Sequence, residues 1–383
     1  MNYKLSALMS QYTDKNINNQ FEPVAVGRYG IRKRSEIYKK DLASDYSKNK
    51  VIYKDTLTIG LGSKQIDVGV LTEDAIYSVS PAYTTFKINT SVVKPQYLEL
   101  FFKAFNDVLT QKYMIASARQ GKKVDIKSML NEEIFIPDFD IQEQVISNIN
   151  LLVRAMEKDE RIVSLYDELV KARFVEMFGL FPSNEKGWEV GTIRDLVTEV
   201  RYGSSRKAAE GNNGKYPYLR MNNITYSGEL DLSDTKTIDV PDDELEKCTV
   251  RRGDLLFNRT NSKELVGKTC VYNRDDAMVL AGFVIRVRLN ERALPEFVSA
   301  FLNTDFSKTM LLGMCKEAIG QANINAQEFQ NIAIYIPPIS LQKDFIEFKE
   351  QVDKSKVVIQ KRIDLYTELL NKKMDEFFNP EVS

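Results

Sequence analysis

The sequence has no histidine among its 383 residues, and it has only three cysteines and one tryptophan. The absence of histidine excludes Ser-His-Asp and Cys-His nucleophilic catalysis and every His-ligated metal site. The cysteines, Cys248, Cys270 and Cys315, form no CxxC pair, which is typical of a protein in a reducing compartment. Any catalysis would therefore depend on carboxylates, lysines or a cofactor.

Long apolar runs are also missing. No stretch approaches the roughly 20 consecutive apolar residues that a membrane-spanning helix needs. The first residues, MNYKLSALMSQ, lack the hydrophobic region and the cleavage site of a signal peptide. We therefore expect a cytoplasmic protein, and the length allows about two to three domains, each with its own core.

The formal net charge is only −1, but charge is unevenly distributed along the chain. Basic residues are concentrated in 27–40, 119–127 and 251–274, whereas the segment 229–246 is strongly acidic. Basic islands in a neutral chain favour a nucleic-acid surface, although a solvated loop explains any single island about equally well.

A long internal repeat divides the chain. LYDEL at 165–169 recurs as LYTEL at 365–369, and the surrounding segments 134–179 and 334–379 align without a gap. The correspondence continues upstream and then fades, which indicates a duplicated unit of roughly 190 residues, too long for a solenoid repeat. The chain is thus expected to contain two copies of one domain, each followed by the same kind of segment.

That following segment is predicted to be a long helix. In each copy a stretch of about 38 residues, which begins at 141 in the first copy, contains neither proline nor glycine. Its apolar residues recur at alternating steps of four and three, which gives one apolar stripe, or seam. We expect the two helices to pair as an antiparallel rod, with LYDEL and LYTEL on the seam and with the two domains at opposite ends in approximate two-fold symmetry. The alternative is that each helix packs onto its own domain. The residues predicted to pair are Val145, Leu152, Tyr166, Val170, Phe345, Val352, Tyr366 and Leu370.

Each domain copy mixes short β-type segments, such as TLTIGLG and FVIRVRL, with the amphipathic helical segments 95–114 and 295–311. An α+β fold is expected. SKELVGKT (262–269) ends like a P-loop, but Ser262 occupies the position of the first glycine, and a strand-like CVY follows instead of a helix. No catalytic motif is complete, so we predict neither catalytic residues nor a metal site.

Segments rich in Arg, Lys, Asn, Gln and Ser supply candidate DNA contacts, because these side chains bond to phosphates and base edges. In loops, Asn and Ser often only form turns. The predicted DNA-binding residues of the second copy are Tyr202, Ser204, Ser205, Arg206, Lys207, Arg220, Asn222, Asn223, Arg259, Asn261, Lys263, Lys268, Gln321 and Asn323. Those of the first copy are Arg28, Arg32, Arg34, Lys64, Gln65, Lys122 and Lys123.

Together these features resemble the specificity subunit of a type I restriction–modification system. The second half carries GWEVGTIRDL, YPYLRMNNI, VRRGDLLFNRTN, GQANIN and IYIPPISLQKD. The first half keeps SPAYTTFKI, KPQYLELFF and IFIPDFDIQEQ, but it has KDTLTIGLGSKQ in place of the GDLLF-RTN pattern. The resemblance covers essentially the whole chain.

The resemblance implies a non-catalytic subunit with target-recognition domains at 1–138 and 183–338 and spacer helices at 139–182 and 339–383. Each domain would read one half of a split target in double-stranded DNA, and the helices would fix the gap. The implied partners are two adenine methyltransferase subunits, which use S-adenosylmethionine, and a restriction subunit, which uses ATP; this chain would hold no cofactor. A stand-alone DNA-processing enzyme and a coiled-coil adaptor without a DNA role are the alternatives.

Overall fold

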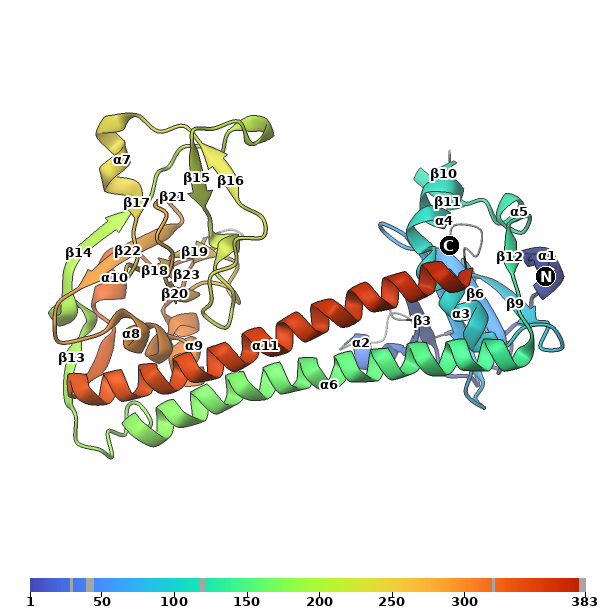
Figure 1. Ribbon diagram of the computed structural model, residues 1–383, viewed down its shortest axis with the longest axis horizontal. Helices are drawn as coiled ribbons and strands as arrows, with labels where there is room; N and C mark the ends of the chain where they lie inside the picture. Colours follow the sequence, from blue (N-terminus) through green and yellow to red (C-terminus); the bar gives the residue numbers. More distant parts are fainter. Residues whose placement is uncertain (28–29, 39–44, 118–120, 319–320, 379–383) are drawn as a thin grey trace. The chain divides into compact units, whose positions relative to one another are not determined.

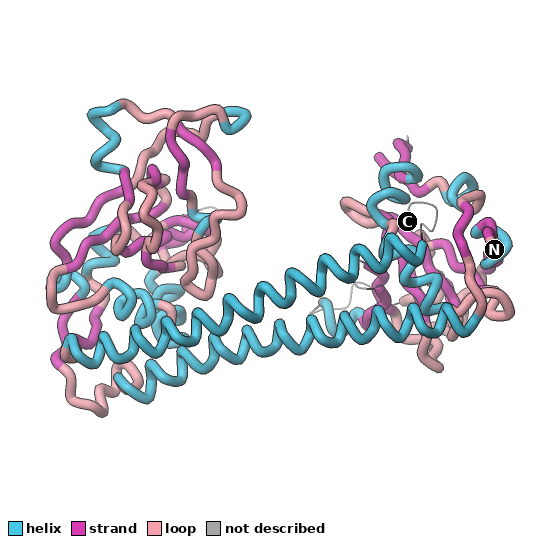
Figure 2. The backbone as a smooth tube through the Cα atoms, in the orientation of Figure 1, coloured by secondary structure: helices cyan, strands magenta, loops and turns pink. Residues whose placement is uncertain are grey.

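The computed structural model describes residues 1–383 except 28–29, 39–44, 118–120, 319–320 and 379–383. It divides into two compact units: unit 1 comprises residues 1–160 and 361–383, and unit 2 comprises residues 161–360. In both units short strands and helices alternate along the chain (Figure 2). The mixed α and β content that the sequence predicts is confirmed.

Unit 1 is built around a four-stranded antiparallel sheet in the order β2-β9-β6-β7, with smaller pairs β1-β12, β3-β4, β5-β8 and β10-β11. The strands are β1 (Asn2–Lys4), β2 (Met9–Tyr12), β3 (Val24–Gly27), β4 (Gly30–Lys33), β5 (Lys50–Ile52), β6 (Thr56–Leu61), β7 (Ile66–Leu71), β8 (Tyr77–Val79), β9 (Thr84–Ile88), β10 (Met114–Ser117), β11 (Gly121–Val124) and β12 (Glu133–Phe135). The helices before the long one are α1 (Leu5–Leu8), α2 (Arg34–Ile37), α3 (Pro95–Ala104), α4 (Asn106–Tyr113) and α5 (Ile126–Met129).

Unit 2 repeats this sheet as β14-β22-β18-β20 and has a second four-stranded sheet, β16-β15-β21-β17, in which β15 and β21 run parallel. The strands are β13 (Glu189–Thr192), β14 (Val197–Tyr202), β15 (Tyr216–Leu219), β16 (Lys236–Ile238), β17 (Thr249–Val250), β18 (Leu255–Asn258), β19 (Thr260–Asn261), β20 (Thr269–Val271), β21 (Met278–Leu280), β22 (Val284–Leu289), β23 (Lys316–Ala318), β24 (Gln321–Asn323) and β25 (Ala333–Ile336). The helices are α7 (Asp242–Cys248), α8 (Pro295–Leu302), α9 (Asp305–Met314) and α10 (Ala326–Gln330), with short 3-10 turns at Ile193–Leu196, Glu210–Asn212 and Met221–Asn223.

The segments 95–114 and 295–311 each form two helices where the sequence suggested continuous ones. In unit 1, Phe105 leaves the helical conformation between α3 and α4. In unit 2, Thr304 starts α9 anew, because its side chain accepts a hydrogen bond from the Ser307 amide. Apolar periodicity does not register such a break, because the apolar residues continue on both sides of it.

The long helices α6 (Phe139–Phe178) and α11 (Ile339–Phe378) have 40 residues each, or about 60 Å of rise (Figure 1). In each unit they run antiparallel. In unit 2, Asp167 of α6 pairs with Lys356, and further along α6 Phe174 and Phe178 contact Phe345. Such long amphipathic helices fit a coiled coil.

The predicted seam residues all lie on the covered side of their helices. Val145, Phe345 and Val352 are buried, and the other five, Leu152, Tyr166, Val170, Tyr366 and Leu370, are half-buried. The seam also reaches the domains: Val145 belongs to the core of unit 1 and Phe345 to that of unit 2. LYDEL and LYTEL were predicted to lie on the seam, but among their apolar residues only the tyrosines do so. Leu165, Leu169, Leu365 and Leu369 are exposed, because they occupy neighbouring positions on the helix that point away from the stripe.

The repeated glutamine at the start of each long helix has a structural role. The side chain of Gln342 is fully buried; it accepts a hydrogen bond from the Leu294 amide at 2.8 Å and donates to the carbonyl groups of Arg292 and Pro337 at 3.0 and 2.8 Å. Gln142 makes the equivalent three bonds in unit 1, to Lys94, Val92 and Pro137. Each glutamine therefore joins its long helix to the loop that precedes α8 or α3.

We predict that Gln342→Ala lowers the free energy of unfolding of unit 2 by about 2–4 kcal/mol, because it removes the hydrogen-bond partner of three buried or part-buried backbone groups. Urea unfolding monitored by circular dichroism measures the change. Gln351→Ala, at an exposed position of the same helix, is the control and should change stability by less than about 0.5 kcal/mol. Equal effects of the two substitutions would contradict the structural role.

Candidate nucleic-acid interface

In unit 2 an arginine stacks on the aromatic ring of Tyr202, the last residue of β14. The Arg259 guanidinium lies 4.9 Å from the centre of the Tyr202 ring, and it donates to the Gly282 carbonyl group at 3.4 Å. The Tyr202 ring is 46% exposed, and the neighbouring Phe283 is 49% exposed. Arginine and exposed aromatic rings together can bond to base edges and stack on bases.

The GDLLFNRTN segment explains why Arg259 is available while its neighbours are not. Asp254 is buried and accepts hydrogen bonds from the Arg251 amide and from Arg288, so it holds the turn before β18. Asn258 is also buried, and its side chain donates to the Leu265 carbonyl group. The strand thus fixes a backbone from which Arg259 projects beside Tyr202.

The turn after β14 carries the basic residues Arg206 and Lys207. Gly203 is required there, because a Cβ atom at this position would lie 2.2 Å from the Leu280 carbonyl oxygen. The buried hydroxyl of Tyr218 donates to the carbonyl groups of Ser204 and Arg206 and so fixes the turn. Ser205, Arg206 and Lys207 are exposed, whereas Ser204 is buried.

Arginines predicted to bind DNA are paired with carboxylates in this structure. Arg206 donates two hydrogen bonds to Glu244, at 2.8 and 3.1 Å, and Arg220 donates to the Asp234 carboxylate at 2.9 Å. The Arg206 guanidinium holds the pKa of the Glu244 carboxyl below its usual value. Both carboxylates belong to the acidic segment 229–246. The sequence did not show which residues this segment would contact in the fold.

Three predicted contacts, Lys268, Asn223 and Ser204, are corrected by their burial. Lys268 is 6% exposed and donates to the Met221 carbonyl group at 2.7 Å; burial lowers the pKa of its ammonium. Asn223 is 1% exposed and donates to the carbonyl groups of Asp231 and Asp234. Both side chains, like Ser204, support the fold beneath the surface, since a buried and bonded group cannot reach DNA without unfolding its surroundings.

The remaining candidates of unit 2 lie at or near the surface. Asn222 and Lys263 are exposed, and Asn261 is half-buried on β19. Asn323 of β24 is half-buried and accepts a hydrogen bond from the Thr260 hydroxyl. The side chain of Gln321 lies outside what the structure describes, although its backbone forms part of β24.

In unit 1 the candidates flank a hollow of about 420 Å³. Arg34 of α2, Tyr38, Tyr83 and Lys123 of β11 are among its lining residues. The Tyr83 ring lies where a side chain of residue 60 would be, which explains why Gly60 stands in the part of unit 1 that departs from the GDLLF-RTN pattern. Arg32, Lys64 and Lys122 are exposed, Gln65 is half-buried, and Arg28 lies outside the described residues.

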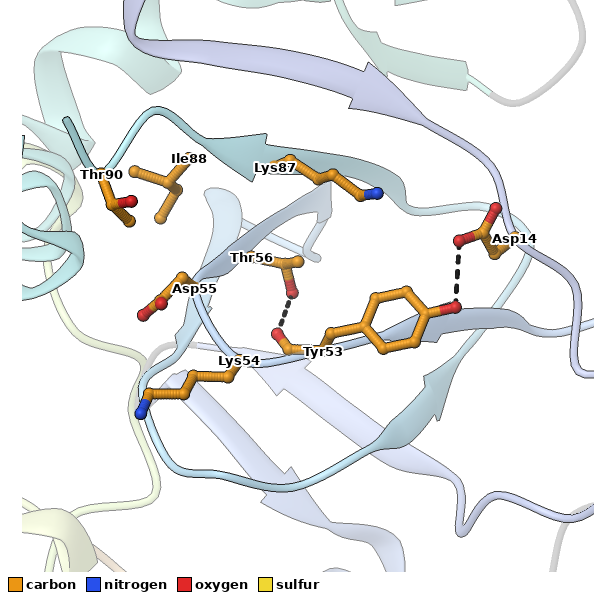
Figure 3. A pocket seen from close by; sticks show the side chains of 8 residues that line it. All are labelled: Asp14, Tyr53, Lys54, Asp55, Thr56, Lys87, Ile88 and Thr90. Atoms are coloured by element: carbon orange, nitrogen blue, oxygen red, sulfur yellow. Dashed lines mark hydrogen bonds between the residues drawn. The ribbon is translucent and has the colours of Figure 1, made fainter. Parts of the chain in front are cut away.

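A second hollow in unit 1, also about 420 Å³, has mixed charge (Figure 3). Lys54 and Lys87 line it together with Asp14 and Asp55. The Tyr53 hydroxyl donates to the Asp14 carboxylate at 3.0 Å. Because the lysines and carboxylates balance, this hollow has no net attraction for phosphate.

Residues 185–366 match the family described as the type I restriction modification DNA specificity domain. The resemblance read from the sequence is thereby confirmed, and the arginines described above lie in the part of the chain that matches this family.

Two curated relatives are each 25% identical over 198 residues: the type I restriction enzyme EcoKI specificity subunit of Escherichia coli (strain K12) and the putative type I restriction enzyme MjaX specificity subunit of Methanocaldococcus jannaschii. Each match covers 51% of this chain but only 42% and 46% of the two relatives. The chain therefore matches less than half the length of the curated relatives.

Two solved structures share the fold. The type-I restriction-modification S subunit from M. genitalium is 12% identical, with a TM-score of 0.50, over 99% of this chain and 96% of that chain. A chain from a structure of complex assembly and conformational transition in the type I R-M system is 15% identical, with a TM-score of 0.56, over 98% and 97%. At these identities the likeness concerns the fold alone.

Within the described ranges, no group of His, Cys, Asp and Glu side chains could hold a metal ion. No helix there is long and apolar enough to cross a membrane. Phe283 and the exposed Tyr226 lie on the surface of the DNA specificity domain and were not singled out by the sequence. Neighbouring Gly282 and Gly228 were the available signals, because glycine marks turns that present an adjacent side chain.

A half-buried lysine lies in the same domain. Burial lowers the pKa of Lys308 from 10.5 to about 8, and the charges of Lys171 and Lys268 act in the same direction. Its ammonium donates to the Gly267 carbonyl group and lies 5.0 Å from the centre of the Tyr226 ring.

Between pH 8 and 10.5 the unfolded chain keeps a proton at Lys308 that the folded chain has released. The contribution of Lys308 to the free energy of unfolding therefore rises with pH across this window. We predict that Lys308→Met flattens the rise relative to the wild type, as measured by urea unfolding at pH 7.5, 9 and 10.5. Lys186→Met, at an exposed site, should leave the profile unchanged. An unchanged profile in Lys308→Met would refute this assignment.

Proposed function

We propose that this chain is the sequence-specific DNA-binding subunit of a type I restriction–modification system and reads a bipartite target. The observation that carries the proposal is the recurrence of one strand order. The sheet β14-β22-β18-β20 lies in the DNA specificity domain, and unit 1 has the sheet β2-β9-β6-β7 in the same order. Two such domains in one chain would read two half-sites.

In the second domain, Arg259 with Tyr202 and Phe283 would read bases, and Lys207, Asn222 and Lys263 would contact the surrounding DNA. In the first domain, Arg34 and Lys123 beside the hollow would do so, with Arg32, Lys64, Gln65 and Lys122 on the neighbouring surface. Arginine suits guanine because its two parallel donors match the O6 and N7 acceptors.

The proposed partners are two copies of an adenine methyltransferase subunit and a restriction subunit. The exposed leucines Leu165 and Leu169 of α6 have equivalents in Leu365 and Leu369 of α11. Because the same exposed pair occurs on both helices, one kind of partner can dock twice. S-adenosylmethionine and ATP would belong to these partners, all in the cytoplasm.

The chain itself is proposed to be non-catalytic. The curated relatives are named specificity subunits, and the sequence lacks histidine. The test of the whole proposal is to express the chain with a methyltransferase subunit and to map methylated adenines in the host DNA. A split motif with a constant gap supports it. DNA cleavage by the purified chain would instead favour a stand-alone enzyme, and unmethylated DNA with no DNA binding would favour an adaptor.

We predict that Arg259→Ala lowers methylation of the target by about 10- to 100-fold, since a base-reading arginine contributes about 1–3 kcal/mol. Methylation rates of the reconstituted complex on the mapped target measure the effect. Arg252→Ala removes another exposed arginine of the same island, which pairs with Asp275, and should change the rate by less than about threefold. Equal rates for the wild type and Arg259→Ala would show that Arg259 is not a reader.

We predict that Leu165→Asp with Leu169→Asp removes one methyltransferase subunit from the complex, and that Leu365→Asp with Leu369→Asp added removes both. A charge placed in an apolar contact must be desolvated, which disfavours docking. Size-exclusion chromatography with light scattering counts the bound subunits. Leu180→Asp, at a position 54% exposed outside the helices, is the control. Full assembly of the fourfold variant would rule out this docking surface.

A further inference from the structure

The acidic segment 229–246 supplies a carboxylate to each of several cations of the DNA specificity domain. Glu244 binds Arg206, Asp234 binds Arg220, Asp242 lies 3.9 Å from Lys215, and Glu229 binds Lys356 at 2.5 Å. These partners lie on different elements, so the pairings are a property of the folded domain. The segment carries eight of the 54 acidic residues of the chain and a single basic residue.

The pairing of Arg206 with Glu244 occupies the edge of the guanidinium that would bind DNA. Nε and one terminal nitrogen of Arg206 each donate to a carboxylate oxygen. This two-bond geometry is the one with which arginine binds guanine or phosphate. Arg206 therefore cannot present this edge to DNA while Glu244 holds it.

The pair is both fixed and accessible. The backbone of Arg206 is fixed by Tyr218, and Leu245 of α7 packs against the same small core as Tyr218. The side chains of Arg206 and Glu244 are nevertheless 46% and 42% exposed. The Arg206 fork can therefore leave Glu244 for another acceptor without a change in the fold.

We propose that Glu244 and Asp234 are specificity-determining residues that withhold Arg206 and Arg220 from the phosphates of non-target DNA. This inference rests on the proposed DNA-reading function of the domain. A phosphate offers Arg206 the same kind of acceptor that Glu244 already provides, so the exchange gains little. It also leaves the Glu244 carboxylate unpaired beside the negatively charged backbone, which opposes binding.

Target DNA differs because contacts made elsewhere in the interface compensate for the exchange. Base contacts with the target fix the register of the DNA and can place an acceptor where it bonds to both donors of Arg206, whereas non-target DNA makes only phosphate contacts without a fixed register. A free arginine would gain from either DNA, but an arginine held by Glu244 gains only from the target. The carboxylates thus lower the affinity for DNA in general and raise the ratio between target and non-target binding. The pKa values of Glu244 and Asp234 are both lowered by their arginines, so both carboxylates stay charged at neutral pH.

The test measures the binding of the full chain to a fluorescent 30-base-pair duplex without target sites, between 50 and 200 mM salt. We expect Glu244→Gln to bind about three- to tenfold more tightly than the wild type. We also expect its plot of log affinity against log salt to be steeper by about 0.9, the value for one additional phosphate contact. Asp234→Asn should act in the same direction and provides a second variant if Glu244→Gln fails to fold.

Asp275→Asn is the matched control. It removes one negative charge from another exposed ion pair of the same domain, that with Arg252 at 2.7 Å. It should therefore reproduce the effect of removing one charge and releasing an arginine, Arg252, that the proposal does not place in the interface, about twofold or less. The double variant Arg206→Ala with Glu244→Gln should lose the gain in affinity, because the gain depends on the released arginine.

The results distinguish a wrong role for the carboxylates from a wrong proposed function. If the wild type binds DNA in a salt-dependent way but Glu244→Gln matches Asp275→Asn, or keeps its gain without Arg206, the role of the carboxylates is wrong and the proposed function stands. If the wild type and all variants fail to bind duplex DNA, the proposed function fails first. In the complex with methyltransferase, Glu244→Gln should also increase methylation at sites that differ from the target by one base pair.

Discussion

The attachment of each long helix to its domain depends on one buried side-chain amide. The side-chain amides of Gln142 and Gln342 each accept one hydrogen bond and donate two. Their three partners are backbone groups from two different segments of the chain. An apolar contact at the same place could slide, whereas three directional bonds fix both the position and the rotation of the first helical turn. The direction in which each long helix starts from its own core follows from this junction.

The sequence was most informative where periodicity and repetition act together. The gapless alignment of 134–179 with 334–379 and the three-four spacing predicted two long helices, and the structure has α6 and α11 there. The same reasoning misplaced Leu165 and Leu369 on the seam, because the sequence alone does not show whether a leucine beside a seam residue is covered or exposed. It also missed the breaks at Phe105 and Thr304, since a local cap or an altered dihedral leaves the apolar pattern intact.

The candidate site was less predictable because chemistry at a surface depends on distances that sequence does not contain. Arg259 and Lys268 stand in one basic island, yet Arg259 stacks on exposed Tyr202 while Lys268 donates to a backbone carbonyl group beneath the surface. Arg259 directly follows β18, whose four residues are all buried, whereas Lys268 follows the positive-φ turn at Gly267 and precedes the buried start of β20. Arg28 and the side chain of Gln321 lie outside the described residues.

The positions of the charges in the fold say more about DNA binding than the net charge does. A net charge of −1 seems unsuited to DNA binding, because affinity for a duplex grows with the number of cations that reach phosphates. In the folded domain the acidic segment 229–246 cancels cations one by one through contacts such as Arg206–Glu244, and it leaves Arg259 with an aromatic ring and a carbonyl group as neighbours. An arginine held by a neutral acceptor is released to DNA at little electrostatic expense, whereas one held by a carboxylate must exchange anions. Two classes of arginine therefore exist on one surface, and the second class contributes only when the rest of the interface fits.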